Sequence, residues 1–438
     1  MDETHDPERT TWVESARGAT DFPIQNLPFG VFRRRGDADV PASVGIAIGG
    51  EILDVTACHD EGRFSGLAER AAEACTAPSL NGLMALGRDH RVELRRQVSA
   101  LLAEDSPAHR ANRRLGDRIL VPMAEAELLV PAAIGDYTDF YASVHHAFNV
   151  GSMLRPENPL LPNYKWVPIG YHGRASSIVA SGTQVRRPRG QVKPQGAADP
   201  VYAASRMLDY EMEVGCFVGA GNPLGQPVPV GQAESHIFGL CLVNDWSARD
   251  VQSWEYQPLG PFLSKSFATS VSPWVATLEA LEPFRIPAAA RPDGDPAPLP
   301  YLTDETDRSA GGVDIVLEVY LATAQMRARA IPPLRLSRSR VAGLYWTFAQ
   351  MLAHHTSGGC NLRPGDLFAS GTVSGPGRDE RGCLLELTWR GAEPLPLPSG
   401  ETRTFLEDGD EVIMRGRCER TGAAAIGFGE CRGIVAPA

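Results

Sequence analysis

In residues 208–218 (LDYEMEVGCFV), acidic side chains alternate with apolar ones. This period of two predicts a β-strand with Asp209, Glu211 and Glu213 on one face. Carboxylates that follow one another on a face repel, and no Lys or Arg stands between these three. The apolar opposite face indicates burial, where a carboxylate is tolerated only if it is paired or bound to a metal. We therefore expect a cation at this strand, although an isolated Glu-x-Glu pair would more often be a solvated acidic face.

Two further polar segments are candidates for a site. Residues 136–146 (DYTDFYASVHH) bring acids, phenols and two imidazoles together in eleven positions. Residues 244–252 (NDWSARDVQ) directly follow the apolar stretch 237–243, so their polar groups lie at a predicted strand end, where sites are often built. In isolation, Asp245 could equally be a helix N-cap.

A lysine and a glycine-rich loop complete the candidate chemistry. Lys265 stands between apolar neighbours in GPFLSKSFAT (260–269), where its ammonium either reaches solvent or meets an anion. Residues 370–375 (SGTVSG) offer backbone N–H groups and hydroxyls, which can bind a carboxylate or simply turn the chain. Because this loop lacks a GKS ending and a strand–loop–helix context, we exclude a nucleotide phosphate loop.

A mainly β scaffold must position these residues. Apolar alternation and turn residues predict a hairpin of strands 43–48 and 51–55, and later strands at 208–218, 236–243, 313–321, 384–389 and 411–417. Apolar residues at helical spacing predict helices at about 80–104 and 337–354. The Pro-rich stretch 283–300 is expected to be a surface loop. Strands and helices do not alternate regularly, so we predict a mainly β or α+β fold.

The composition limits the possible partners. The 438 residues carry 42 Lys and Arg against 53 Asp and Glu, a formal net charge of −11, which disfavours nucleic acid and anionic membranes. An anionic substrate would need a local group of cations. The eight cysteines contain no C-x2-C pair and are expected to be reduced thiols. Because the chain lacks a signal-like start and any run of 18 apolar residues, we expect a cytoplasmic protein.

The order and length of these segments resemble the fumarylacetoacetate hydrolase family. The resemblance covers most of the chain and rests on residues 22–32 (FPIQNLPFGVF), 136–146, 167–177 (VPIGYHGRASS), 208–218, 244–269 and 361–376. It implies an enzyme that hydrolyses the carbon–carbon bond of fumarylacetoacetate, an anionic diketone, to fumarate and acetoacetate, the last step of tyrosine catabolism. It also implies a homodimer.

The same resemblance implies how the chain is divided. It implies a small SH3-like barrel at 21–120, followed by a large mixed β-roll at 121–438 that carries catalysis. Residues 1–20 are polar, and from this composition we expect a loose N-terminal tail before the barrel. The sequence by itself indicates only a small β-rich part, a helical stretch and a longer β-rich part, with a boundary near 118–125.

By this resemblance, four carboxylates ligate a divalent cation: Asp139, Glu211, Glu213 and Asp245. The assignment agrees with the acidic strand, because hard carboxylate oxygens without cysteine favour Mg²⁺ or Ca²⁺ over zinc. The family pattern also places Lys265 and Thr269 beside a second cation of the Mg²⁺ type, although an ammonium is an unusual neighbour for a metal.

The resemblance also assigns the catalytic groups. His146 would be the general base and Glu386 the carboxylate that fixes its tautomer. His145 is a rival base, and a lone Glu between leucines is more often an outward-facing strand residue. The oxyanion would be stabilised by Arg249, Gln252 and Lys265. The substrate would be bound by Tyr141, Arg155, Tyr171, Arg249, Gln252 and Thr372.

Several of these assignments have alternative interpretations, either as structural residues or as parts of a related protein. Each tyrosine could be a packing residue, and Arg155 could pair with Glu157 on the surface. An acylpyruvate hydrolase or an oxaloacetate decarboxylase of the same superfamily would keep the acidic triad and the lysine, but such relatives generally lack the long N-terminal segment. A non-catalytic Ca²⁺-binding scaffold would need neither His146 nor Arg249.

Overall fold

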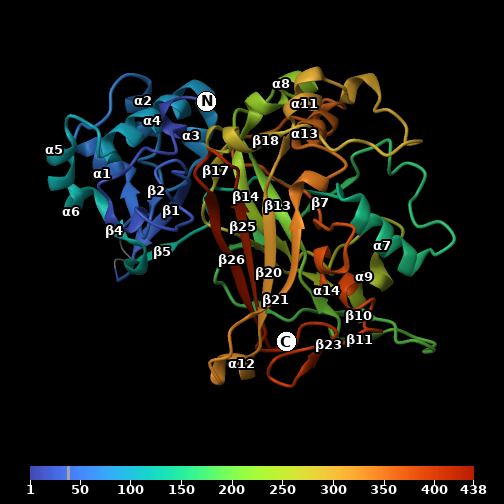
Figure 1. The fold of residues 1–438 in the computed structure, drawn as a ribbon. Coiled ribbons are helices and arrows are strands. Elements are labelled where there is room, and N and C mark those ends of the chain that lie inside the picture. Colours follow the sequence, from blue (N-terminus) through green and yellow to red (C-terminus); the bar gives the residue numbers. More distant parts are fainter. Residues whose placement is uncertain (37–39) are drawn as a thin grey trace.

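The computed structural model describes residues 1–36 and 40–438 and has an α+β architecture (Figure 1). A small antiparallel sheet with its helices forms the N-terminal part, and two large sheets dominate the remainder. The strands of these sheets are mostly antiparallel and do not alternate with helices. The predicted α+β fold class is therefore confirmed.

The N-terminal sheet has five strands in the order β4-β3-β2-β1-β5. They are β1 (Phe29–Arg34), β2 (Ser43–Ile48), β3 (Glu51–Asp54), β4 (Leu120–Pro122) and β5 (Ala126–Leu128). The predicted hairpin is confirmed, and Gly49 turns β2 into β3 with a φ of +58° that glycine adopts without strain. The helices around it are α1 (Val55–Asp60), α2 (Leu67–Ala74), α3 (Asn81–Ala85), α4 (Arg88–Leu102), α5 (His109–Arg114) and α6 (Gly116–Ile119).

Two expectations for the N-terminal part are wrong. The helix predicted at about 80–104 is divided into α3 and α4, because Gly87 between them has a φ of +81°, which a right-handed helix cannot contain. Residues 1–20 are not loose, since Trp12 is buried and its indole donates to the Leu101 carbonyl at 2.9 Å. The first residues of the chain are thus packed onto α4.

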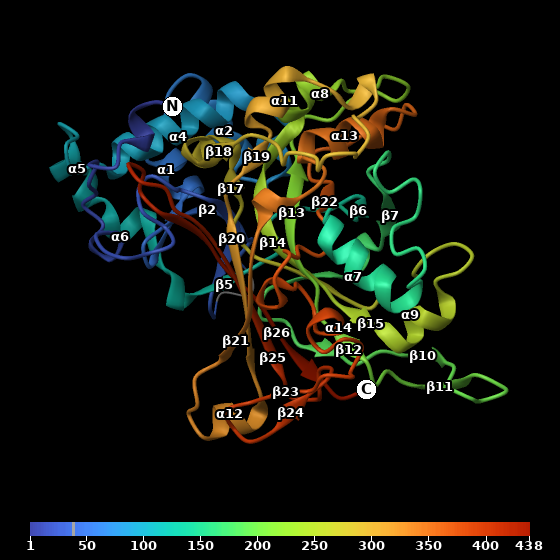
Figure 2. The same ribbon diagram turned by 45° about the vertical axis from the view of Figure 1, so that its right-hand side comes forward.

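Two large sheets pack against each other in the C-terminal part, through contacts of β14 and β16 with β25 and β26 (Figure 2). The eight-stranded sheet contains β6 (Tyr137–Phe140), β7 (Gly170–Gly173), β8 (Ile178–Ala180), β13 (Met212–Val218), β14 (Ile237–Asp245), β16 (Thr269–Val271), β17 (Ala276–Thr277) and β22 (Leu367–Ala369). Its path is β7-β6-β22-β13-β14-β16-β8. The five-stranded sheet runs β21-β20-β25-β26-β9 and contains β9 (Val185–Arg186), β20 (Val316–Ala322), β21 (Leu334–Arg340), β25 (Glu411–Cys418) and β26 (Ile426–Ala436).

Short helices and strand pairs surround these sheets. Helices α7 (Val144–Leu154), α9 (Arg249–Glu255) and α14 (Leu384–Leu387) lie together on one side in both views (Figures 1 and 2). The other helices are α8 (Val230–Ala233), α10 (Leu278–Leu281), α11 (Glu305–Ala310), α12 (Ala324–Ala328) and α13 (Phe348–Thr356). The two-stranded pairs are β10 (Arg189–Val192) with β11 (Val201–Ala204), β12 (Leu208–Asp209) with β15 (Ser247–Ala248), β18 (Arg285–Ile286) with β19 (Gly312–Val313), and β23 (Leu395–Pro396) with β24 (Thr402–Arg403).

Several predicted C-terminal elements are confirmed. The strands expected at 236–243, 313–321 and 411–417 are β14, β20 and β25, with ends that differ by up to three residues. The Pro-rich loop is irregular from residue 287 to 299, as expected from residues that cannot donate to a strand ladder.

The acidic strand and its distant partner segment differ from the prediction. Residues 208–218 do not form one strand: β12 pairs with β15, and only β13 joins the large sheet. Residues 384–389 are not a strand, because 384–387 form the helical turn α14. A short apolar run such as LLEL fits either structure, and its period cannot decide between them.

The helix predicted at 337–354 is also wrong. This stretch contains the end of β21 and most of α13. The capping box formed by Thr347 and Gln350 begins α13 at Phe348, about ten residues later than expected. The apolar residues that indicated a helix are buried, but those before Phe348 lie in backbone that is not α-helical.

The N-terminal and C-terminal parts share contacts at their boundary. The backbone N–H of Phe29 donates to the Val275 carbonyl at 3.0 Å, and the Phe29 ring lies edge-on to Phe238. Arg91 of α4 and Glu279 of α10 form a buried ion pair at 2.7 Å. The two parts are therefore joined by apolar packing and by a charged pair that loses much of its value if either partner is removed.

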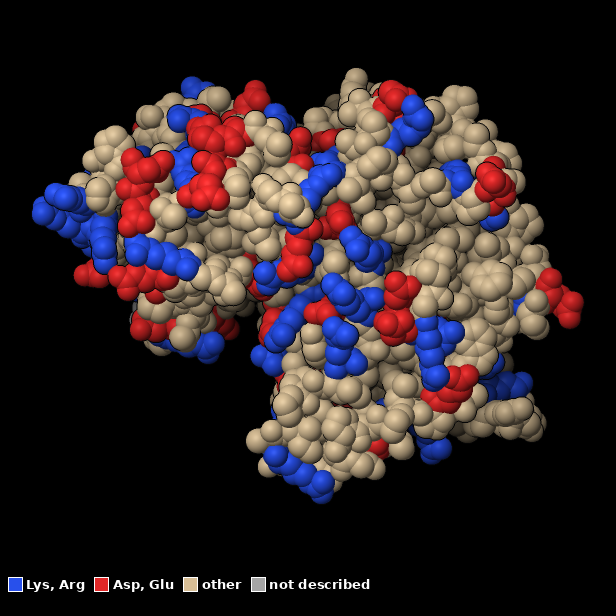
Figure 3. Space-filling view, in the orientation of Figure 1, with Lys and Arg blue, Asp and Glu red and all other residues tan. Residues whose placement is uncertain are grey.

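The exposed face of β20, β21, β25 and β26 carries interleaved basic and acidic side chains (Figure 3). Arg335 pairs with Glu318 at 2.9 Å, and Arg415 pairs with Glu430 at 2.7 Å. Alternating signs of this kind leave no uniformly positive surface on this face. Within the described part of the chain, every helix is too short or too polar to span a bilayer.

Candidate active site

Four carboxylates from distant parts of the chain meet at the large sheet. Asp139 lies on β6, Glu213 on β13, Glu211 just before β13, and Asp245 at the end of β14. All four are buried, and one oxygen of each lies within 4.8 Å of the others. The pairing of β14 with β13, and of both β13 and β6 with β22, brings these positions together. Two of the three acidic positions of the predicted strand, Glu211 and Glu213, thus form part of a charge cluster.

Lys265 lies inside this cluster. Its Nζ is 2.6 Å from Glu211 Oε2 and 2.6 Å from Asp245 Oδ2. Burial lowers the pKa of Lys265, but the neighbouring carboxylates, led by Asp245, raise it more, so the pKa stands above its usual value. Lys265 therefore stays protonated and donates to the carboxylates. An ammonium has no lone pair to offer a metal, so in this structure Lys265 is a counter-charge to Glu211 and Asp245.

The other two carboxylates lack donors. Both side-chain oxygens of Glu213 and Oδ1 of Asp139 are buried without a hydrogen-bond partner among the described residues. Burial, together with the nearby carboxylates, raises the pKa of both side chains well above the usual range. Lone acceptors of this kind are costly in a protein interior. The cluster therefore fits a divalent cation, which would be held by hard oxygen ligands.

Two hydroxyl groups orient Asp245. Thr269 Oγ1 donates to Asp245 Oδ1 at 2.9 Å, and the Tyr171 hydroxyl donates to Oδ2 at 3.0 Å. Asp245 ends a strand, so the alternative that it caps a helix is wrong. In this structure Tyr171 and Thr269 act on the acidic cluster, because each fixes the direction of a carboxylate that belongs to it.

A histidine and a glutamate form a second buried group. His146 Nδ1 lies 2.7 Å from Glu386 Oε2, and Asn149 donates to Oε1 at 2.8 Å. Ser374 Oγ and Cys383 Sγ contact Oε2 at 2.8 and 3.1 Å. Burial raises the pKa of Glu386, but His146 and these donors outweigh it and lower the pKa to about 2. Glu386 is therefore an ionised, fully buried carboxylate and not an outward-facing residue.

The geometry distinguishes between the two adjacent histidines. His146 is buried and bonded to Glu386, whereas His145 is half-buried. Both lie in the first turn of α7, where consecutive side chains point about 100° apart, so only one of them can face Glu386. Burial raises the pKa of Glu211, but Arg249, Lys265 and His146 outweigh it and lower that pKa below its usual value. The pair of His146 and Glu386 and the acidic cluster therefore belong to one site.

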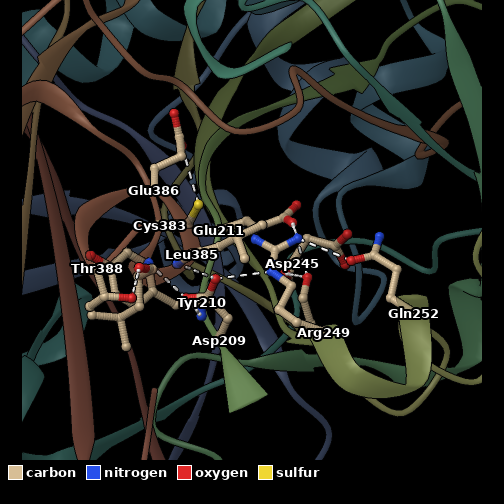
Figure 4. A network of polar contacts seen from close by, with 12 residues as sticks. Asp209, Tyr210, Glu211, Asp245, Arg249, Gln252, Cys383, Leu385, Glu386 and Thr388 are labelled. Atoms are coloured by element: carbon tan, nitrogen blue, oxygen red, sulfur yellow. Dashed lines mark hydrogen bonds and ion pairs between the residues drawn. The ribbon is translucent and has the colours of Figure 1, made fainter. Parts of the chain in front are cut away.

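Arg249 connects the parts of this site (Figure 4). Its Nη1 lies 2.5 Å from Glu211 Oε1 and donates to Gln252 Oε1 at 3.2 Å. Its Nε donates to Asp209 Oδ2 at 2.9 Å. The remaining Nη2 is buried and has no partner among the described residues. The Nε and Nη1 groups of Arg249 are thus bonded to neighbouring side chains, and Nη2 is its unused donor.

The remaining predicted residues lie at varying distances from these groups. The Tyr141 ring lies edge-on to the His146 ring, with centroids 5.3 Å apart. Thr372 Oγ1 is buried without a partner in the described structure, which suits a donor kept for a substrate. Arg155 donates weakly to the Pro159 carbonyl at 3.5 Å, and within the described residues it forms no ion pair with Glu157. Among the described residues, no hydrogen bond or ion pair joins Arg155 to the acidic cluster.

Sequence reasoning missed the residues that hold Glu386 and Arg249. Asn149 lies three positions after His146, a helical spacing that could have indicated it. Ser374 lies in the glycine-rich loop but was not singled out. Asp209 was grouped with Glu211 and Glu213, although both of its oxygens already accept from donors and it is not one of the four clustered carboxylates. The sequence pattern does not distinguish Asp209 from the other acids. The strand break after β12, seen in the structure, does.

Comparisons with known proteins identify the family of this chain. The chain matches family models described as Fumarylacetoacetase N-terminal at residues 25–131 and Fumarylacetoacetate (FAA) hydrolase C-terminal at residues 136–436. It is 48% identical to a fumarylacetoacetase of Oryza sativa subsp. japonica, over 98% of this chain and 97% of that protein. A fumarylacetoacetase of Arabidopsis thaliana is 49% identical, over 95% and 96% of the two chains. A solved fumarylacetoacetate hydrolase of Exiguobacterium antarcticum has a TM-score of 0.51 at 16% identity, over 94% of this chain and all of that one, which concerns the fold alone.

Replacement of Glu213 tests whether the acidic cluster holds a metal. Glu213→Gln removes a charge from the carboxylate that lacks donors, so we expect the affinity for Mg²⁺ or Ca²⁺ to fall by about tenfold or more. Isothermal titration calorimetry of the chelator-treated protein measures this change. Glu430→Gln, on the exposed face of β26, is the control and should bind as the wild type does. Equal affinity in all three proteins would contradict the metal site.

Proposed function

The chain belongs to the fumarylacetoacetase family, and we propose that it hydrolyses fumarylacetoacetate to fumarate and acetoacetate, the last step of tyrosine catabolism. The observation that carries this proposal is the buried pair of His146 and Glu386 beside a cluster of four carboxylates. Identity of 48% along 98% of the chain supports it. The cations near the cluster also suit an anionic substrate in a protein of negative net charge.

In this proposal His146 is the general base. Glu386 accepts from Nδ1, so the unprotonated Nε2 can take a proton from water as the water oxygen attacks the carbonyl of the fumaryl group. The carbon–carbon bond then breaks, and its electron pair leaves with the acetoacetate fragment as an enolate. The proton held by His146 returns to that carbon. Water has thus added its hydroxyl to one product and its hydrogen to the other.

The charge that develops on the attacked oxygen needs nearby donors. Arg249 has an unused Nη2, and Gln252 is fixed by its bond to Arg249. Each such preorganised donor contributes about 2.7–4 kcal/mol to the transition state. Lys265 acts with them as a fixed positive charge between Glu211 and Asp245.

The acidic cluster is the metal-binding site in this proposal. Asp139, Glu211, Glu213 and Asp245 would hold a divalent cation, which supplies Lewis-acid polarisation to the diketone oxygens when it is bound. We propose Mg²⁺ or Ca²⁺, because every ligand is a hard oxygen. The Thr269 hydroxyl donates its proton to Asp245, which leaves its oxygen lone pairs for the second cation of the Mg²⁺ type.

Four further residues would hold the substrate. Arg155 supplies a positive charge for a carboxylate, and its Nε is buried without a partner among the described residues. Thr372 supplies a free hydroxyl. Tyr141 lies edge-on to His146, and its hydroxyl would donate to a keto oxygen of the substrate. Tyr171 assists through Asp245.

We also propose that the enzyme is a cytoplasmic homodimer. All eight cysteines are free and all but Cys360 are buried, which suits a reducing compartment. Exposed apolar side chains between residues 254 and 263 support an interface with a second copy, notably Leu259 and Phe262 at 96% and 71% exposure. Sedimentation equilibrium of the full chain measures this state, and a monomer at every concentration would contradict it.

The activity itself is tested with three substrates. We expect the purified chain to remove the diketone absorbance of fumarylacetoacetate and to release fumarate and acetoacetate in equal amounts. An acylpyruvate and oxaloacetate, assayed beside it, should be turned over with a lower kcat/KM. A higher kcat/KM for either would indicate a related activity of the same superfamily. No turnover of any of the three would favour the non-catalytic scaffold.

The roles of the two adjacent histidines are separated by substitution. His146→Ala removes the base, so we expect kcat to fall roughly 10²–10⁴-fold. Glu386→Gln should lower kcat in the same direction, because the amide no longer fixes the tautomer. His145→Ala, one position earlier in α7, is the matched control and should keep kcat. Bound metal, measured by calorimetry, should be equal in all variants, and its loss in His146→Ala would count against the assigned role.

A further inference from the structure

We propose that Asp209 is a positioning residue, which holds Arg249 and the turn that carries Glu386 in one fixed geometry. This inference rests on the proposed function, and it concerns an acid that the metal cluster does not use. Asp209 ends β12 and its side chain is fully buried. It contacts both Arg249 and the turn that carries Glu386 (Figure 4).

Every contact of Asp209 is to a donor. Oδ2 accepts from Arg249 Nε at 2.9 Å and from the Leu385 backbone N–H at 3.0 Å. Oδ1 accepts from the backbone N–H groups of Leu384 and Tyr210 at 2.8 and 2.9 Å. Four donors occupy both oxygens, so the carboxylate is fully used. Asp209 is therefore structurally separate from the acids that lack donors.

The first partner of Asp209 is the α14 turn. The initial N–H groups of a helix have no partner within the helix and are usually met by an N-cap side chain. The N-cap of α14 is Cys383, whose side chain does not cap the turn but contacts Glu386. Asp209 takes the place of the cap from another part of the chain. Because Glu386 lies in the same turn, the position of Asp209 determines where Glu386 meets His146.

The second partner of Asp209 is Arg249. The guanidinium is held between two carboxylates, with Nε at Asp209 and Nη1 at Glu211. This opposition leaves Nη2 as the unused donor. Without the charge of Asp209, Arg249 would be attracted to Glu211 alone and would turn toward the metal ligands. Asp209 thus balances the pull of the acidic cluster on the residue that meets the oxyanion.

A second buried pair in this chain shows what a structural role looks like. Asp410 is buried, accepts from Arg403 Nε at 2.8 Å and Nη2 at 3.0 Å, and accepts from the Glu407 backbone N–H at 2.9 Å. Its chemistry therefore matches that of Asp209. Neither of these two partner residues belongs to the proposed site. Asp410→Asn is consequently a matched control for Asp209→Asn.

The experiment compares these two variants in the fumarylacetoacetate assay. Asn keeps the size of Asp but loses the charge and one acceptor, so we expect Asp209→Asn to lower kcat by about 100-fold with little change in KM. Its metal affinity should stay within about threefold of the wild type. Asp410→Asn should lose a similar number of degrees in Tm and keep kcat within about twofold. An unchanged kcat in Asp209→Asn, or an equal loss in Asp410→Asn, would overturn the proposal.

Double variants identify the residues through which Asp209 acts. In an Arg249→Gln or a Glu386→Gln background, part of what Asp209 positions is already lost. We expect the Asp209→Asn change to cost at least tenfold less in each background than in the wild type, since coupled residues are not additive. A structural role would lower kcat by the same factor in every background. That result in both backgrounds would overturn the proposal.

Two further comparisons keep the outcome clear. If Asp209→Asn does not fold, Asp209→Glu keeps the charge and moves it by one methylene, and it should still lower kcat at unchanged metal affinity. A wild-type kcat in that variant would overturn the positioning role. The wild type is assayed in parallel: its failure to turn over substrate would contradict the proposed function, whereas an active wild type with an equally active Asp209→Asn would contradict only this inference.

Discussion

The burial of four carboxylates around one point is the constraint on which the catalytic part depends. Such a group is tolerated in a protein interior only when cations and donors surround it. Lys265 and Arg249 supply two of the cations from outside the strands that carry the acids. Tyr171 and Thr269 supply hydroxyls to one carboxylate, yet Glu213 has no donor in the described structure. The excess of acidic over basic groups explains why the site fits a divalent cation.

The same constraint determines how the catalytic groups are supported. Glu211 contacts both Lys265 and Arg249, so the metal side and the oxyanion side share one carboxylate. Arg249 is in turn opposed by Asp209, which also holds the turn of Glu386. Binding and proton transfer therefore depend on a continuous set of buried charges. Such a set is rigid because each member loses its partner if another moves.

Local patterns predicted the faces of the elements but not the long-range partners. The alternation at 208–218 correctly indicated that Glu211 and Glu213 belong to one cluster, because a period of two is a local property. The break after Asp209 depends on pairing with Ser247, which the alternation does not encode. The helical turn at Glu386 depends on its cap, which lies about 175 residues earlier in the chain. Family resemblance indicated His146 and Glu386, whereas tertiary packing alone shows what holds them.

The most direct test of this account is a metal titration of activity in the wild-type protein. The chain is freed of metal with a chelator, and fumarate release is measured as Mg²⁺ or Ca²⁺ is returned. The account predicts no release without metal, and a half-maximal rate at the Kd obtained by calorimetry for one cation per chain. Full release from protein shown by elemental analysis to be free of metal would contradict the central role of the carboxylate cluster.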